Sequence, residues 1–282
     1  MEEVETTPKK KKQYKALLPL KTDQTVKDQF QFTPVSVLEP SKEYKKNWGD
    51  LGAYLDVIET RRSADCEYLP GLKFSEFHAG LTENIVKYWS MEGDVIVDPF
   101  CGRATRAFVS SKLNRKYQGY EVSPLTHKRV EEHLAKHNLT AQVFLEDGCK
   151  LNQTPDSSTD LVMTCPPYYC LEVYEDAPEQ LSRLPDYISF LDKIDECSKN
   201  CFRVLKAGKF CAWVVADFRH KGQFISFSSH CITSFKAAGF VHWDTVIIKN
   251  FSPFAALQMG KVASKRYTSK IHEYLLIFRK PE

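Results

Sequence analysis

The chain of 282 residues lacks an apolar run close to the roughly 20 residues that a membrane-spanning helix needs, and no apolar signal core opens its N-terminus. Its nine cysteines contain no CxxC pair and no cysteine–histidine spacing typical of a zinc site. An odd number of cysteines also does not fit a closed disulfide framework. These absences predict reduced thiols, no bound metal and a cytoplasmic location.

A strong excess of charge of one sign is also missing. The net charge is +3 and the isoelectric point is about 8.3, which does not require a nucleic-acid partner and is compatible with one. The hydrophobic share of 43% and the charged share of 27% are ordinary for a soluble globular protein. The length is sufficient for one core with additions, so we expect one main domain.

The most informative stretch is DLVMTCPPYY, residues 160–169. Its short apolar run is typical of a buried parallel strand, and the two prolines must end that strand because neither can donate to a sheet ladder. Ligands of open α/β sheets bind outside the carboxyl ends of strands. The stiff loop would hold the Cys165 side chain, the Pro166 carbonyl and the Tyr168 ring in a set arrangement, which suits a flat substrate with an exocyclic amine.

Three further strands are followed or ended by acidic residues, and the first two of these positions suit a nucleoside. The run GDVIVDPFCGRATR ends a strand at Asp98, and its glycine-containing loop opens a helix from about Ala104. About 20 residues later a second strand ends at Glu121, whose carboxylate can accept from both hydroxyls of a ribose. A helix over 125–137 and a strand over 141–145 follow, and Asp147 comes directly after that strand.

The spacing of these elements predicts an α/β fold. Strands alternate with helices about every 25 residues, which favours βαβ units, right-handed crossovers and a parallel sheet. We expect three more strands over 209–217, 243–249 and 272–280, which brings the sheet to seven. Helices are expected behind an N-cap at Thr82, from Pro185 to an end at Gly208, and over 227–238.

Three of these segments resemble segments of a known family. Thr164-Cys165-Pro166-Pro167-Tyr168 resembles the (D/N/S)-P-P-(Y/F/W) motif of S-adenosylmethionine-dependent DNA amino-methyltransferases, which methylate N6 of adenine or N4 of cytosine. Residues 98–106 resemble the D-P-F-x-G-S-G-T-T cofactor loop, with Arg103 and Ala104 in place of Ser and Gly. Residues 272–280, HEYLLIFRK, resemble the last strand of the same family, which carries an H-E-Y-hydrophobic-F-x-K run. The resemblance covers 74–280 and implies a class I (Rossmann-like) methyltransferase with a seven-stranded, mostly parallel sheet.

The resemblance also implies roles for individual residues. The catalytic residues would be Cys165, Pro166, Pro167 and Tyr168. S-adenosyl-L-methionine would be bound by His78, Asp98, Pro99, Phe100, Gly102, Thr105, Glu121, Asp147 and Thr164. The substrate would contact Tyr169, Asp217, Arg219, Lys261, Lys265 and Arg266. The expected partner is DNA, with the target nucleotide flipped out of the duplex because base pairing hides its amine.

Outside the main motifs the chain is less regular. We expect a basic tail over 1–28, which contains the run Lys9-Lys10-Lys11-Lys12, an N-terminal arm over 29–73 and the catalytic domain over 74–282. Residues 170–184 read as a flap over the base or as a solvated connection. Lysine and arginine residues are interleaved with aromatic residues over 252–270, and this composition suits contact with DNA. No long insertion separates the motifs, so any DNA-recognition element would be small.

Several alternatives stay open from the sequence. The target amine, cytosine N4 or adenine N6, is one of them. RNA, or a glutamine of a protein-release factor, is an alternative substrate, because Pro-Pro-Tyr enzymes of this fold also act on guanine N2 and on glutamine. Cys165 could instead attack carbon 6 of a pyrimidine, as in carbon-5 methyltransferases. An inactive nucleic-acid-binding module is compatible with Ala104 and Cys165. The sequence distinguishes neither monomer from homodimer nor an isolated enzyme from one paired with a restriction nuclease, and a nucleoid location would follow from a prokaryotic or viral source.

Overall fold

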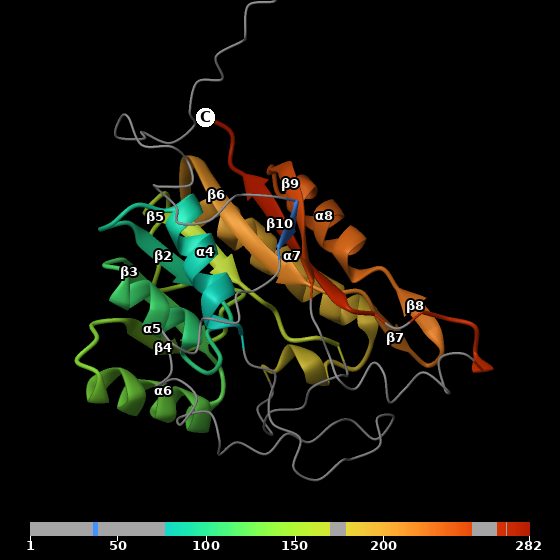
Figure 1. Ribbon diagram of the computed structural model, residues 1–282, viewed down its shortest axis with the longest axis horizontal. Helices are drawn as coiled ribbons and strands as arrows, with labels where there is room; N and C mark the ends of the chain where they lie inside the picture. The colour runs from blue at the N-terminus through green and yellow to red at the C-terminus, as the bar shows by residue number, and fades with distance from the viewer. Residues whose placement is uncertain (1–35, 39–76, 170–178, 250–263, 269) are drawn as a thin grey trace, which may run out of the picture. The chain divides into compact units, whose positions relative to one another are not determined.

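The structure is a computed structural model that describes residues 36–38, 77–169, 179–249, 264–268 and 270–282 (Figure 1). The basic tail 1–28 and most of the arm 29–73 that we expected lie outside the described residues. The same holds for residues 170–178 of the expected flap and for Lys261.

Eight described strands form one sheet. They are β1 (Val37–Leu38), β2 (Val95–Asp98), β3 (Lys116–Glu121), β4 (Gln142–Leu145), β5 (Thr159–Thr164), β6 (Leu205–Val215), β9 (Val241–Lys249) and β10 (His272–Arg279). Their order across the sheet is β1-β9-β10-β6-β5-β2-β3-β4. Neighbours from β4 to β6 pair in parallel, and β10 runs antiparallel to β6 and β9. The seven predicted strands are all present, and β1 adds an edge strand parallel to β9.

The helices form two groups. The described helices are α4 (Ala79–Trp89), α5 (Thr105–Lys112), α6 (Pro124–Lys136), the 3-10 turn η2 (Leu181–Arg183), α7 (Tyr187–Val204) and α8 (Phe227–Ala237). Helix α4 packs on α5, and Phe108 of α5 contacts His133 of α6, whereas α7 packs on α8. Figure 1 shows α4 and α7 on opposite faces of the sheet. None of the described helices is both long and apolar enough to cross a membrane.

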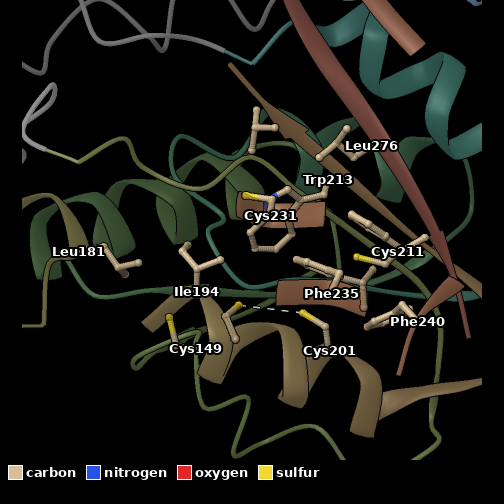
Figure 2. Packing of buried hydrophobic residues seen from close by; sticks show 14 of the residues in the cluster. Cys149, Leu181, Ile194, Cys201, Cys211, Trp213, Cys231, Phe235, Phe240 and Leu276 are labelled. Carbon is tan, nitrogen blue, oxygen red and sulfur yellow. Dashed lines mark hydrogen bonds between the residues drawn. The ribbon is translucent and has the colours of Figure 1, made fainter. Parts of the chain in front are cut away.

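The larger core lies between the sheet and the pair α7 and α8. Val97, Val162 and Trp213 of three adjacent strands belong to this core. Figure 2 shows Trp213 beside Phe235 of α8. Free cysteines fill gaps between these rings as small apolar side chains, because a buried thiol behaves as a hydrophobe. The buried free cysteines in the described part of the chain are Cys101, Cys149, Cys197, Cys201, Cys211 and Cys231.

Two predicted helix boundaries are wrong. Helix α4 begins earlier than expected, because His78 rather than Thr82 is its N-cap: Leu81 N donates to His78 Nδ1 at 3.3 Å. Helix α7 ends at Val204 rather than at Gly208. Gly208 lies inside β6 with φ +74°, next to a shift in the pairing of β6 with β5, so this glycine accommodates an irregular strand and does not end a helix.

A small hairpin was not expected from the sequence. Strands β7 (Phe218–His220) and β8 (Gln223–Ile225) pair antiparallel directly after β6. Lys221 and Gly222 join them with φ values of +49° and +81°, the positive angles of a type I′ turn.

Candidate active site

The residues predicted at strand ends lie along one edge of the sheet. Asp98 ends β2, Glu121 ends β3 and Thr164 ends β5, while Asp147 follows β4 closely. Because these four strands are parallel neighbours, their carboxyl ends point the same way. That edge is where open α/β sheets bind ligands. The structure therefore places Asp98, Glu121, Asp147 and the Pro-Pro-Tyr loop along the same edge of the sheet, and Asp98 contacts Thr164 directly before this loop.

Asp98 is the centre of a buried hydrogen-bond network. Its carboxylate, fully shielded from solvent, accepts from Tyr117 Oη at 2.6 Å, from Thr164 Oγ1 at 2.5 Å and from Phe100 N at 3.0 Å. Burial and the nearby carboxylate hold the pKa of the Tyr117 hydroxyl well above its usual value, so it stays a donor. The network joins β2, β3, β5 and the loop after β2, and it fixes the start of that loop relative to the catalytic strand.

Arg106 is the fourth partner of Asp98, and the sequence analysis missed it. Its Nε donates to Asp98 Oδ2 at 2.5 Å, its Nη2 donates to the Phe100 carbonyl, and its guanidinium lies 4.6 Å from the centre of the Phe77 ring. Burial opposes the charge, but Asp98 more than offsets this and raises the pKa of Arg106. The signal available was an arginine eight residues after an acid, at a position where the family loop has a threonine.

Close backbone contacts fix the shape of the loop between β2 and α5. Gly102 and Ala104 both have left-handed φ values, +56° and +68°. A Cβ added at Gly148 would lie only 1.8 Å from the Pro99 carbonyl oxygen, so the backbone after β4 is pressed against this loop. Ala104, rather than a glycine, occupies a left-handed position of this loop, and the approach of the loop backbone to a cofactor stays a prediction.

Thr105 offers a direct test of whether the loop fits a cofactor. It is the first residue of α5, and its Oγ1 is buried without a hydrogen-bond partner among the described residues. A buried hydroxyl is normally satisfied, and a polar group of a bound molecule would satisfy this one. His78, predicted to contact the cofactor, has its Nδ1 engaged as the cap of α4, and burial lowers its pKa.

The next part of the site suits an adenosine. A cavity of about 330 Å³ is lined by Val122, Pro124, Leu145, Glu146, Asp147, Lys150, Asn152 and Glu179. It combines apolar side chains for a flat ring with carboxylates for an amine, and it adjoins Glu121 of β3. Glu121 Oε1 accepts from Ser123 N at 2.8 Å, which orients this carboxylate.

Asp147 is held from two sides. Its Oδ1 accepts from Cys149 N at 2.9 Å, and its Oδ2 lies 3.3 Å from Nζ of Lys193 on α7. Lys193 also pairs with Glu196 at 2.7 Å, and although burial opposes its charge, these two carboxylates raise its pKa. Lys193 could not be recognised from the sequence, because a lysine on an amphipathic helix normally faces solvent.

The Pro-Pro-Tyr loop follows β5 as predicted. Cys165 is the one free cysteine of the described residues that is not buried, and the next residue, Pro166, is buried. The Tyr168 ring is half-buried and meets the rings of Phe218 and Phe227 edge-on at 6.2 and 6.3 Å between centroids. These contacts fix the position of the Tyr168 ring beside the loop, and Phe218 belongs to the unexpected hairpin.

The predicted substrate residues are placed differently from one another. Tyr169 is buried among Tyr187 and Phe190, with centroids at 5.5 and 5.7 Å, so its ring packs into the core. Asp217 is also buried, and its Oδ1 accepts from Ser228 N at 2.9 Å in the first turn of α8. Direct substrate contacts of these two residues stay predictions.

The basic residues lie outward. Arg219 is exposed on β7, and Lys265 and Arg266 are exposed in the described segment 264–268. The guanidinium of Arg219 lies 4.5 Å from the ring centre of Tyr267, which joins this segment to the hairpin. In the part of the chain that the structure describes, no group of three or more His, Cys, Asp or Glu residues could hold a metal ion.

Comparison with known families decides what this site belongs to. A family model described as DNA methylase, for the N6 and N4 methyltransferases, matches residues 2–132 and 159–282. The chain belongs to the DNA methylase family. This membership confirms the family predicted from the motifs and supports S-adenosyl-L-methionine as the cofactor.

Two curated relatives of this DNA methylase come from Bacillus amyloliquefaciens. The orphan methyltransferase M.BamHII is 35% identical over 65 residues, 22% of this chain and 24% of that protein. The type II methyltransferase M.BamHI is 33% identical over 84 residues, 28% of this chain and 19% of that protein. Each match thus spans a quarter or less of the relative's length.

Solved structures bear on the fold alone. The [4+2]-cyclase SpnF has a TM-score of 0.54 at 16% identity and covers 88% of this chain and 99% of its own. A geranyl diphosphate methyltransferase in complex with GPP and sinefungin has a TM-score of 0.51 at 12% identity, covering 72% of this chain and 78% of its own. The α/β fold class with a mostly parallel sheet is therefore confirmed.

Proposed function

We propose that this DNA methylase transfers a methyl group from S-adenosyl-L-methionine to the exocyclic amine of a flipped-out base in DNA. The observation that carries the proposal is the hydrogen bond from Thr164 to Asp98 at 2.5 Å. It ties the Cys165-Pro166-Pro167-Tyr168 loop to the start of the cofactor loop. The groups expected to hold the methyl donor and the acceptor base are thereby fixed relative to each other, and positioning of this kind supplies much of the rate of a group transfer.

The residues of this chain fit the cofactor at three points. Glu121 would accept from the ribose hydroxyls, the cavity beside Val122 and Asp147 would take the adenine, and Thr105 would bond the methionine end. When bound, the cofactor supplies an electrophilic methyl group, and the protein needs no covalent chemistry of its own for this transfer.

The acceptor base would be held by the loop after β5. The Pro166 carbonyl would accept one amine hydrogen, which turns the nitrogen lone pair toward the methyl donor. The Tyr168 ring would stack on the base, and its contacts with Phe218 and Phe227 hold it in place for that role. A base within a duplex cannot reach this loop, so the nucleotide must leave the stack.

Cys165 bears on the choice of base. It occupies the position where the family has Asp, Asn or Ser, and a thiol accepts a second amine hydrogen less well. A small, weakly polar residue here favours N4 of cytosine over N6 of adenine. The relative M.BamHI is a type II methyltransferase. The corresponding expectation for this chain is that it modifies DNA at specific sites, in the cell compartment that contains the DNA.

The proposal is tested by incubating the full chain with S-adenosylmethionine carrying a tritiated methyl group and with unmethylated DNA or RNA, followed by digestion to nucleosides. We expect label on DNA, in N4-methylcytosine or N6-methyladenine by mass. Label on RNA alone, or on carbon 5 of cytosine, would overturn the proposal.

A further inference from the structure

The hairpin β7–β8 has two faces with different surroundings. Side chains alternate along a strand, so Phe218 and Ile225 share one face while Arg219 and Phe224 share the other. The inner face packs on the core cluster, and the Phe218 ring meets the Tyr168 ring at 6.2 Å. The packing of the inner face therefore places the hairpin beside the Pro-Pro-Tyr loop, with its outer face turned away from the core.

The outer face combines a large exposed ring with positive charge. Phe224 is 57% exposed although it lies directly opposite Arg219 in the hairpin pairing. The Arg219 guanidinium is 5.6 Å from the Phe224 ring centre and 4.5 Å from that of Tyr267, so it lies within reach of both rings. Exposed Lys221 at the turn, and Lys265 and Arg266 beside Tyr267, add three more cations.

We infer that this outer face contacts duplex DNA, with the Phe224 ring stacking on a base exposed where the target nucleotide leaves the helix. The inference rests on the proposed function, because an extruded nucleotide is what leaves an unstacked base next to the site. Apolar rings that enter an opened base step are a known way to stabilise distorted DNA, and surrounding cations neutralise the phosphates. The Phe218–Tyr168 contact brings this ring-bearing hairpin next to the loop that would hold the flipped base.

The chain offers a matched control at the other edge of the sheet. Trp243 of β9 is 44% exposed, and the Arg279 guanidinium lies 5.2 Å from its ring centre. Arg279 pairs with Phe210 in the middle of β6, whereas the hairpin follows the end of β6, so this second arginine–aromatic pair lies away from the hairpin. Trp243→Ala removes another exposed aromatic ring without touching the hairpin.

The test measures binding of the full-length protein to 30-base-pair fluorescent duplexes, one fully paired and one with a single abasic site, by anisotropy. We expect Phe224→Ala to weaken binding to the abasic duplex about tenfold, as loss of one base–aromatic stack does, and Phe224→Trp to retain it. Arg219→Gln should lower the slope of log affinity against log salt by about one. Trp243→Ala should leave affinity and slope unchanged.

Thermal unfolding of each variant confirms that it folds. Equal affinity of Phe224→Ala and wild type, an equal loss in Trp243→Ala, or tighter binding to an RNA duplex of the same sequence would overturn the inference, as would a wild type that binds no DNA. Binding is read without turnover, so a failure here is distinct from the absence of methyl transfer in the labelling experiment.

Discussion

Arg106 and Asp98 form an ion pair inside the protein, with 2.5 Å between Nε and Oδ2 and both side chains almost wholly shielded from solvent. The pair links the first turn of α5 to the end of β2. Asp98 therefore has a structural role. Its carboxylate holds the loop after β2 through Phe100 N and holds the end of β5 through Thr164. The predicted contact of Asp98 with the cofactor would be made by a carboxylate that these donors already hold in place.

Removing the positive charge of Arg106 should strongly destabilise the folded protein. Arg106→Met leaves a buried carboxylate without its charge partner, and we expect a loss of about 3–5 kcal/mol in the free energy of unfolding, measured in urea. Tyr117→Phe removes one neutral donor from the same carboxylate and should cost about 1 kcal/mol. Asp98→Asn added to Arg106→Met should recover part of the loss. Similar costs for the two single variants would contradict a central role for the ion pair.

Gly148 should tolerate no side chain. The 1.8 Å between an added Cβ and the Pro99 carbonyl oxygen requires the backbone to move, so Gly148→Ala should destabilise the protein by at least about 2 kcal/mol and weaken cofactor binding. Gly222→Ala is the control, because nothing lies within 4 Å of its added Cβ and only its left-handed φ opposes the change. Calorimetric titration with sinefungin and urea unfolding measure both effects, and a Gly148→Ala protein that binds like wild type would contradict the close approach.

Glu121 should contribute a charged hydrogen bond to the cofactor. Glu121→Gln keeps the size of the side chain but removes one acceptor site and the negative charge, so the dissociation constant for S-adenosylmethionine should rise about tenfold. Lys136→Gln, on the last turn of α6, is a surface control. An unchanged dissociation constant for Glu121→Gln would show that the ribose lies elsewhere.

His133 should make stability depend on pH. Burial, with help from His137 and Lys136, lowers the pKa of His133 from 6.5 to about 4. The folded state therefore prefers neutral histidine: its contribution is fully present above pH 6.5 and is lost as the pH falls from 6.5 toward 4, by up to about 3 kcal/mol. Urea unfolding across this range should show a shallower loss in His133→Phe than in wild type, and parallel curves would contradict the assignment.

The elements that sequence patterns predict well are those whose signal is local. The apolar runs that end at Asp98 and at Pro166 predicted β2 and β5 correctly. An acid or a pair of prolines ends a strand through residues that are close in sequence, so the strand end can be recognised without knowing its distant neighbours. Gly208 misled for the same reason: a glycine after an amphipathic helix is typical of a helix end, and only the pairing of β6 with β5 shows that it belongs to an irregular strand.

The residues that sequence missed depend on distant partners. In the sequence Arg106 looks like an ordinary helix residue. Only the fold shows that Asp98, Phe77 and the Phe100 carbonyl surround it. Lys193 meets Asp147 across 46 positions of sequence. The hairpin escaped notice because its strands have three residues each and its turn is Lys-Gly rather than the more familiar Asn-Gly.

The most direct test of the central claim is the single-turnover rate of methyl transfer to DNA for wild type, Tyr168→Ala, Tyr168→Phe and Cys165→Ser at saturating cofactor. If an exocyclic amine is the acceptor, Tyr168→Ala should lose at least about tenfold, Tyr168→Phe should retain most of the rate, and Cys165→Ser should retain or exceed it because a hydroxyl accepts an amine hydrogen better than a thiol. Loss of all transfer in Cys165→Ser, with Tyr168→Ala still active, would contradict the account and assign Cys165 as a nucleophile.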